Sequence, residues 1–209
     1  PIKYWAALAL LRGAMSSPAA GLSMLKNRKN KLSEEIQEDE EDFYFRSTLF
    51  DKELNRDDSL TTNAINEYEV QEKNDDFLEI LTQRAEELCN YPSDNKLSKA
   101  ISVLSDWTKG VQEIVDGVKQ KVVYHPIVFC KYIQTAKYIG EKLKDYFGNK
   151  VQVVVATSEL ADEQRRDLID SIHPDKPRIL VATDCLSEGI NLQELFNAVL
   201  HYDLPWNPN

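Results

Sequence analysis

Apolar residues follow one pattern in the first part of the chain and another in the second. From residue 121 onwards, short apolar runs alternate with segments of helical periodicity. The runs cover residues 127–130, 151–156, 178–182 and 198–202. Such runs are typical of strands buried on both faces. Strands that alternate with helices predict an α/β fold, in which a parallel sheet is covered by helices on both faces. Ligands of such sheets bind at the carboxyl ends of the strands.

The first 120 residues combine helical patterns with one polar stretch. Residues 2–11 read as a helix, and Ser17 followed by Pro18 predicts the start of a second helix. Residues 75–90 have helical spacing, and an amphipathic face is expected to follow. That face is formed by Leu97, Ile101, Leu104, Val111 and Ile114.

We expect four regions along the chain. They are a helical segment over 1–32, an acidic and partly flexible linker or insertion over 33–74, helices over 75–120, and the α/β domain over 121–209.

The net charge of −10 comes from one part of the chain. Residues 1–32 carry +6, residues 33–95 carry −15 and residues 96–209 carry −1. A surface that binds nucleic acid must therefore be a local patch, because net negative charge repels the phosphate backbone.

The composition also limits the class of protein. No apolar run is long enough to cross a membrane, so no membrane partner is expected. The three cysteines lack Cys-x-x-Cys spacing, and the three histidines are not spaced as metal ligands. We therefore expect a reduced, cytoplasmic protein without a metal site.

The most informative run is ILVATDCLSEGINLQ, residues 179–193. A strand leads to Thr183, whose hydroxyl at the carboxyl end of the strand suits a phosphate oxygen. Gly189 allows close backbone approach to a ligand, and Asn191 suits a ribose hydroxyl. The run resembles motif V of superfamily 2 helicases. The resemblance implies that Thr183 contacts the nucleic-acid backbone and that Glu188, Gly189 and Asn191 face the nucleotide.

Neighbouring segments resemble other helicase motifs in the same order. Residues 126–139 resemble motif IV, where Lys131 and Thr135 at the start of a helix suit a phosphate. Thr157, followed later by Arg165, resembles motif IVa, which implies that Thr157 also contacts nucleic acid. Asp-Leu-Pro-Trp-Asn-Pro, at residues 203–208, is similar to the Swi/Snf-like bacterial branch of the superfamily.

Together these motifs identify residues 121–209 as resembling the second RecA-like domain of a helicase or DNA translocase, preceded by a helical extension. The resemblance implies ATP and Mg²⁺ as cofactors of a parent protein. It implies nucleic acid, in particular duplex DNA, and the first RecA-like domain of the same parent chain as partners. We expect Thr183, Gly189 and Asn191 to line one exposed edge of the sheet.

Two features predict that this chain alone is inactive. It contains no Gly-x-x-x-x-Gly-Lys-Ser/Thr loop to cradle phosphates. The resemblance also places the last catalytic motif, with its arginine finger, beyond Asn209. We therefore expect no catalytic residue in this fragment and no bound ATP or Mg²⁺.

Two other functions stay open. One is a non-catalytic interaction module or scaffold on a degenerate RecA-like fold. The other is a small-molecule transferase or hydrolase with an ordinary doubly wound sheet. A phosphate-binding loop upstream in the parent gene and a Gln-x-x-Gly-Arg-x-x-Arg motif downstream would favour the motor.

Overall fold

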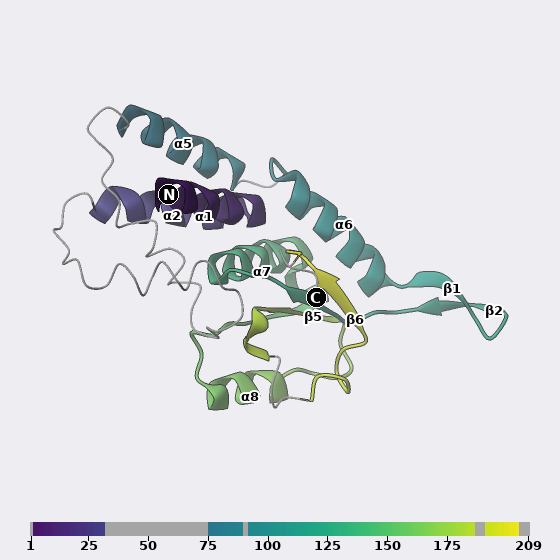
Figure 1. Ribbon diagram of the computed structural model, residues 1–209. Coiled ribbons are helices and arrows are strands. Elements are labelled where there is room, and N and C mark those ends of the chain that lie inside the picture. The colour runs from purple at the N-terminus through teal and green to yellow at the C-terminus, as the bar shows by residue number, and fades with distance from the viewer. Residues whose placement is uncertain (1, 32–74, 90–91, 187–190, 205–209) are drawn as a thin grey trace. The chain divides into compact units, whose positions relative to one another are not determined.

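The structure is a computed structural model that describes residues 2–31, 75–89, 92–186 and 191–204 (Figure 1). The expected linker over 33–74 thus lies outside the described residues. The chain divides into two compact units. We call Pro1–Asp94 with Tyr132–Thr135 the helical unit, and Asn95–Lys131 with Ala136–Asn209 the sheet unit. No helix among the described residues is long and apolar enough to span a bilayer.

The helical unit contains α1 (Ile2–Ser16), α2 (Pro18–Lys31) and α5 (Asp75–Leu88). The Ser17 hydroxyl accepts a hydrogen bond from the Ala20 amide at 3.1 Å, so the predicted cap of α2 is confirmed. Helices α1 and α2 pack closely, because Gly13 has no side chain. A Cβ at this position would lie 2.3 Å from the sulfur of Met24. Met24 is buried in a small core with Ala9, Ala20 and Tyr132.

The sheet unit begins with α6 (Asn95–Lys109), and here the sequence prediction was partly wrong. The amphipathic face ends at Leu104, and Val111 and Ile114 lie instead in a hairpin. The hairpin is formed by β1 (Val111–Val115) and β2 (Val118–Val122).

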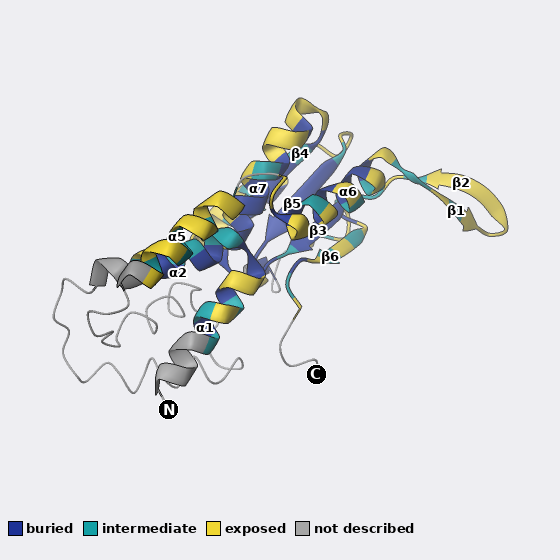
Figure 2. Cartoon of the chain, turned by 90° about the horizontal axis from the view of Figure 1, so that it is seen from above, coloured by how far each residue is buried: buried dark blue, intermediate teal, exposed yellow. Residues whose placement is uncertain are grey.

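Glycine explains the difference. Gly110 has φ +95°, which ends the helix, and Asp116 and Gly117 have φ +53° and +79°. Two consecutive residues with positive φ are typical of a type I′ hairpin turn. The hairpin extends away from the sheet (Figure 2), and Ile114 is 69% exposed.

Four parallel strands form the sheet, in the order β4-β5-β3-β6. They are β3 (Pro126–Phe129), β4 (Gln152–Ala156), β5 (Arg178–Ala182) and β6 (Ala198–His201). The predicted α/β fold, a parallel sheet with helices on both faces, is confirmed. Every residue of β5 is buried, including Arg178 before the apolar residues 179–182 that predicted a buried strand.

Helices α7 (Ile133–Phe147) and α8 (Asp162–Asp170) lie on opposite faces of the sheet (Figure 1). The chain passes from β3 through α7 to the far strand β4, and then returns through α8 to β5. Because crossovers between parallel strands are right-handed, opposite directions of travel place the two helices on opposite faces. Gly140 allows α7 to approach β4, since a Cβ there would lie 2.1 Å from Cγ2 of Val155.

The amino ends of the strands carry a structural arginine. Arg178, at the start of β5, donates hydrogen bonds to the carbonyls of Leu195 at 2.7 Å, Lys176 at 3.1 Å and Pro174. Burial lowers the pKa of Arg178. Burial also lowers the pKa of His125, and the positive charge of Arg178 lowers it further. Arg178 thus holds together the loops at the amino ends of the strands. The candidate site lies at the opposite, carboxyl edge.

Candidate functional site

The carboxyl edge of the sheet brings four loops side by side, because the hydrogen-bond ladder continues past the ends of the strands. The Thr183 amide donates to Ala156 at 3.3 Å, and the Cys130 amide donates to Ala182 at 2.8 Å. The Tyr202 amide donates to Phe129 at 2.9 Å. The loops that follow β4, β5, β3 and β6 therefore start from adjacent positions along one edge.

Thr157 and Thr183 stand at the start of the two loops that follow the neighbouring strands β4 and β5. Each side chain is only 4% exposed. The sequence predicted an exposed position for Thr183, and this prediction was wrong. Thr183 directly follows β5, which has a strand on either side. Neither threonine is exposed at the surface of the sheet unit in this structure.

The loop after β4 is held by Arg165 from α8. Arg165 donates to the Leu160 carbonyl and forms an ion pair with Asp162. The Leu160 amide in turn donates to the Thr157 carbonyl at 3.2 Å. The arginine of the motif IVa resemblance thus shapes its own loop, and its side chain is only 13% exposed.

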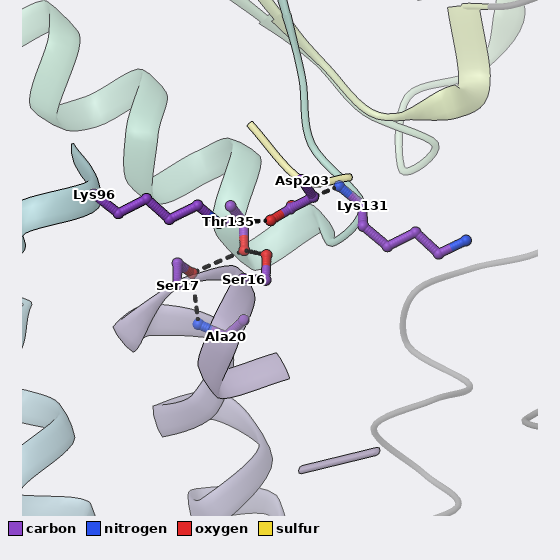
Figure 3. A network of polar contacts seen from close by, with 7 residues as sticks. All are labelled: Ser16, Ser17, Ala20, Lys96, Lys131, Thr135 and Asp203. Carbon is purple, nitrogen blue, oxygen red and sulfur yellow. Dashed lines mark hydrogen bonds and ion pairs between the residues drawn. The ribbon is translucent and has the colours of Figure 1, made fainter. Parts of the chain in front are cut away.

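Lys131 is an exposed cation at this edge, in the loop between β3 and α7. Its side chain extends away from the sheet, and its amide donates to Oδ2 of Asp203 at 2.9 Å (Figure 3). The second carboxylate oxygen of Asp203 accepts from Nζ of Lys96 at 2.9 Å. That ammonium group lies 4.1 Å from the centre of the Tyr202 ring.

Lys96 and Asp203 were not among the predicted site residues. The available signal for Asp203 was its position after the fourth strand, at the edge where ligands bind. No local sequence pattern could have pointed to Lys96, because 107 residues separate it from Asp203 along the chain.

Thr135 lies in the first turn of α7, and its environment differs from the predicted one. Its side chain is completely buried. Its hydroxyl bonds to those of Ser16 at 2.7 Å and Ser17 at 2.8 Å within the helical unit (Figure 3). The hydroxyl predicted to meet a phosphate is therefore engaged inside the protein.

Of the predicted nucleotide-side residues, only Asn191 is described by the structure, and it is exposed. Its Oδ1 accepts from the Gln193 amide at 3.3 Å, and its Nδ2 donates to Glu194 at 3.2 Å. Glu188 and Gly189 lie outside the described residues.

The edge is suited to binding anions. It offers the exposed side chain of Lys131, whereas Thr157 and Thr183 are buried. The described side chains with shifted pKa values lie elsewhere, at the amino ends and beside the hairpin. There, a hydrogen bond with Glu113 raises the pKa of Tyr124. The exposed charge of Lys131 makes this edge a candidate contact surface for an anion.

Comparison with known proteins agrees with this geometry. Residues 108–209 match the family described as "Helicase conserved C-terminal domain". The chain is 36% identical over 85 residues to the probable ATP-dependent RNA helicase MJ0669 of Methanocaldococcus jannaschii, covering 41% of this chain and 22% of that protein. It is 29% identical over 85 residues to the ATP-dependent RNA helicase eIF4A of Kluyveromyces lactis, covering 41% and 20%. The chain thus spans about a fifth of these relatives.

Among solved structures, the C-terminal domain of the Sulfolobus solfataricus SWI2/SNF2 ATPase is 16% identical, with a TM-score of 0.39. That match covers 65% of this chain and 58% of that one, and it is too weak to decide a branch of the superfamily. The segment that matches the helicase family contains all four parallel strands and their carboxyl edge. Over residues 108–209, the chain is therefore similar to the helicase conserved C-terminal domain family.

Proposed function

We propose that this chain supplies one wall of the ATP cleft and part of the nucleic-acid contact surface of an ATP-dependent helicase or DNA translocase. The observation that carries the proposal is the carboxyl edge, where Lys131, Thr157 and Thr183 begin adjacent loops within the family match. Lys131 offers a charge to a phosphate, and the two threonines become ligands when their loops move. Contacts to the backbone rather than to bases imply little sequence specificity.

On the nucleotide side, we propose that Glu188, Gly189 and Asn191 face ATP and its Mg²⁺. The first RecA-like domain of the parent would form the other wall of the cleft. Closure on ATP and reopening after product release would then move the pair along the nucleic acid.

The nucleic acid is proposed to be duplex DNA. The Asp-Leu-Pro-Trp-Asn-Pro sequence of residues 203–208 supports this choice, because it resembles the Swi/Snf-like branch. The two curated relatives are named as RNA helicases, so RNA is the direct competitor. Fluorescence anisotropy with duplex DNA, single-stranded DNA and single-stranded RNA of matched length separates the choices.

The binding test uses Lys131→Ala. We expect weaker binding across all sequences and a salt slope smaller by about 1, because one phosphate contact is lost. Lys144→Ala is the matched control, since Lys144 is also exposed but lies in the last turn of α7. Equal effects of the two substitutions, or no salt-dependent binding of any nucleic acid, would overturn the proposed contact surface.

The chain alone is proposed to hydrolyse no ATP, because its sequence lacks the phosphate-cradling loop. Phosphate release is measured with and without nucleic acid. The Lys131→Ala variant serves as the control for contaminating ATPases, whose activity it would leave unchanged. Turnover that depends on nucleic acid and falls in this variant contradicts the proposal.

The burial of Thr157 and Thr183 favours a second candidate, a non-catalytic interaction module on a degenerate RecA-like fold. This candidate predicts no affinity for ATP in a parent protein that contains both domains. Tight nucleotide binding by the parent, lost on Asn191→Ala, would exclude it.

A further inference from the structure

Asp203 joins three segments of the sheet unit. Its carboxylate accepts from the Lys131 amide at 2.9 Å and from the Lys96 ammonium group at 2.9 Å (Figure 3). Lys131 belongs to the loop after β3, Asp203 follows β6, and Lys96 lies in the first turn of α6. Because β3 and β6 are adjacent and parallel, the ends of these strands meet at the same edge.

We call the contacts of Asp203 with the Lys131 amide and with Lys96 the anchor, because they are shielded and mutually supported. The Asp203 side chain is only 11% exposed, and the Tyr202 amide donates to Phe129 at 2.9 Å just beside it. The Lys96 ammonium group is held by both the Asp203 carboxylate and the Tyr202 ring, at 4.1 Å from the ring centre. Hydrogen bonds with a charged partner are shorter and stronger than neutral ones, and a shielded site strengthens them further.

The anchor decides which part of Lys131 can meet a ligand. Its amide is already donated to Asp203, so that amide is not available to a phosphate. Its side chain points away from the carboxylate and is exposed (Figure 3). Lys96 also balances the charge of Asp203, which would otherwise repel a phosphate approaching the same loop.

We propose that Asp203 is a positioning residue for Lys131. With Lys96 it fixes the backbone of the loop between β3 and α7, so that the Lys131 ammonium group is presented at the carboxyl edge as a phosphate ligand. This inference rests on the proposed function, because it assumes that Lys131 binds the nucleic-acid backbone.

The proposal predicts an effect opposite to that of charge alone. Removing a carboxylate makes the chain less acidic, which should strengthen its attraction to a polyanion. If Asp203 positions Lys131, Asp203→Ala should instead weaken binding. Glu87→Gln is the control for charge, since Glu87 also forms a 2.9 Å ion pair, with Arg84 on the surface of α5.

Two measurements are made on the 209-residue chain and its variants. The first is hydrogen exchange of the Lys131 amide by NMR, which needs no ligand. Asp203→Ala should accelerate this exchange about tenfold, as expected when a bond to a charged acceptor is lost. The second is anisotropy with labelled duplex DNA at several salt concentrations. Here Asp203→Ala should lower the affinity and reduce the salt slope by about 1, as Lys131→Ala does.

A double variant that carries both Lys131→Ala and Asp203→Ala separates a positioning role of Asp203 from a general loss of structure. If Asp203 acts through Lys131, then Asp203→Ala should cause no further loss of affinity in a chain that already carries Lys131→Ala. Asp203→Glu keeps the charge and both acceptor oxygens, and should restore part of the affinity.

Lys96→Met keeps the test decisive if Asp203→Ala does not fold. Its matched control is Lys99→Met, which removes the same charge from an exposed position one turn further along α6. Lys96→Met should accelerate exchange of the Lys131 amide and weaken DNA binding more than Lys99→Met does.

Each outcome has a distinct meaning. Stronger or unchanged DNA binding by Asp203→Ala, with Lys131→Ala still weakening it, overturns the positioning role and leaves the proposed function intact. An additive effect in the double variant overturns it in the same way. A wild-type chain that binds no DNA overturns the proposed contact surface and this inference together, even where the exchange measurement shows that the anchor exists.

Discussion

Thr135 provides the sharpest test of how the helical unit is held together, because sequence and structure assign it different tasks. The sequence predicts a phosphate contact, whereas the structure buries the side chain completely and bonds its hydroxyl to those of Ser16 and Ser17. Thr135→Val keeps the shape of the side chain and removes only the hydroxyl. The substitution therefore separates a structural role from nucleic-acid binding.

The expected magnitude follows from the two lost bonds. A buried hydrogen bond contributes about 0.5–1.5 kcal/mol net, so the pair contributes about 2 kcal/mol. Ser17 keeps its bond from the Ala20 amide, so the cap of α2 should survive. A loss of about 2 kcal/mol corresponds to about thirtyfold faster hydrogen exchange in α1 and α2, where exchange occurs by local opening.

Hydrogen exchange followed by NMR or mass spectrometry measures this effect helix by helix. Thr108→Val is the matched control, because Thr108 is also buried but donates only within α6, to the carbonyls of Leu104 and Ser105. Its substitution should change exchange little, since such bonds add little to a helix that already satisfies those carbonyls. Unchanged exchange in Thr135→Val, combined with weaker nucleic-acid binding, would refute the structural role and support the sequence prediction.

Three further predictions concern the sheet unit. Arg178→Met should lower the free energy of unfolding in urea by about 3–5 kcal/mol, because three carbonyls lose a charged donor; a loss below about 1 kcal/mol would contradict this. The pKa of His125 is lowered in the folded chain, so the unfolded chain binds more protons, and the free energy of unfolding should fall as the pH drops through about 6.5. His125→Gln should reduce this dependence of the unfolding free energy on pH, and an unchanged dependence would contradict the prediction. Gly140→Ala should destabilise the fold by about 1–3 kcal/mol in thermal unfolding. The added Cβ would overlap the Val155 side chain, and the cost of this overlap should exceed the gain in helix propensity. A more stable variant would show that Val155 can move aside.

The sheet could be predicted closely from the sequence, because burial on both faces of a strand leaves a local signal. The continuous apolar run of residues 178–182 coincides with β5. The runs at 127–130, 151–156 and 198–202 each lie within one residue of the strands observed. The hairpin of β1 and β2 was missed, although Gly110 and the Asp116-Gly117 pair were visible signals. Val111 and Ile114 also fit a helical face, and short apolar segments do not distinguish the helical period from the strand period.

The candidate site was only partly accessible from the sequence. The carboxyl edge and its loops follow from strand order, since parallel strands end on one side. Burial of Thr157, Thr183 and Thr135 does not follow, because it depends on which neighbours cover each hydroxyl.

By itself, the sequence determined the strands, the helicase motifs and the edge at which the loops begin, since each is encoded in a few consecutive residues. Only the tertiary structure decided which side chains remain available there. It placed β6 beside β3 and thereby brought Asp203 to the Lys131 amide and to Lys96, which is 107 residues away along the chain. Contacts at such separations arise from the order of strands in the sheet, and no local pattern of residues encodes that order.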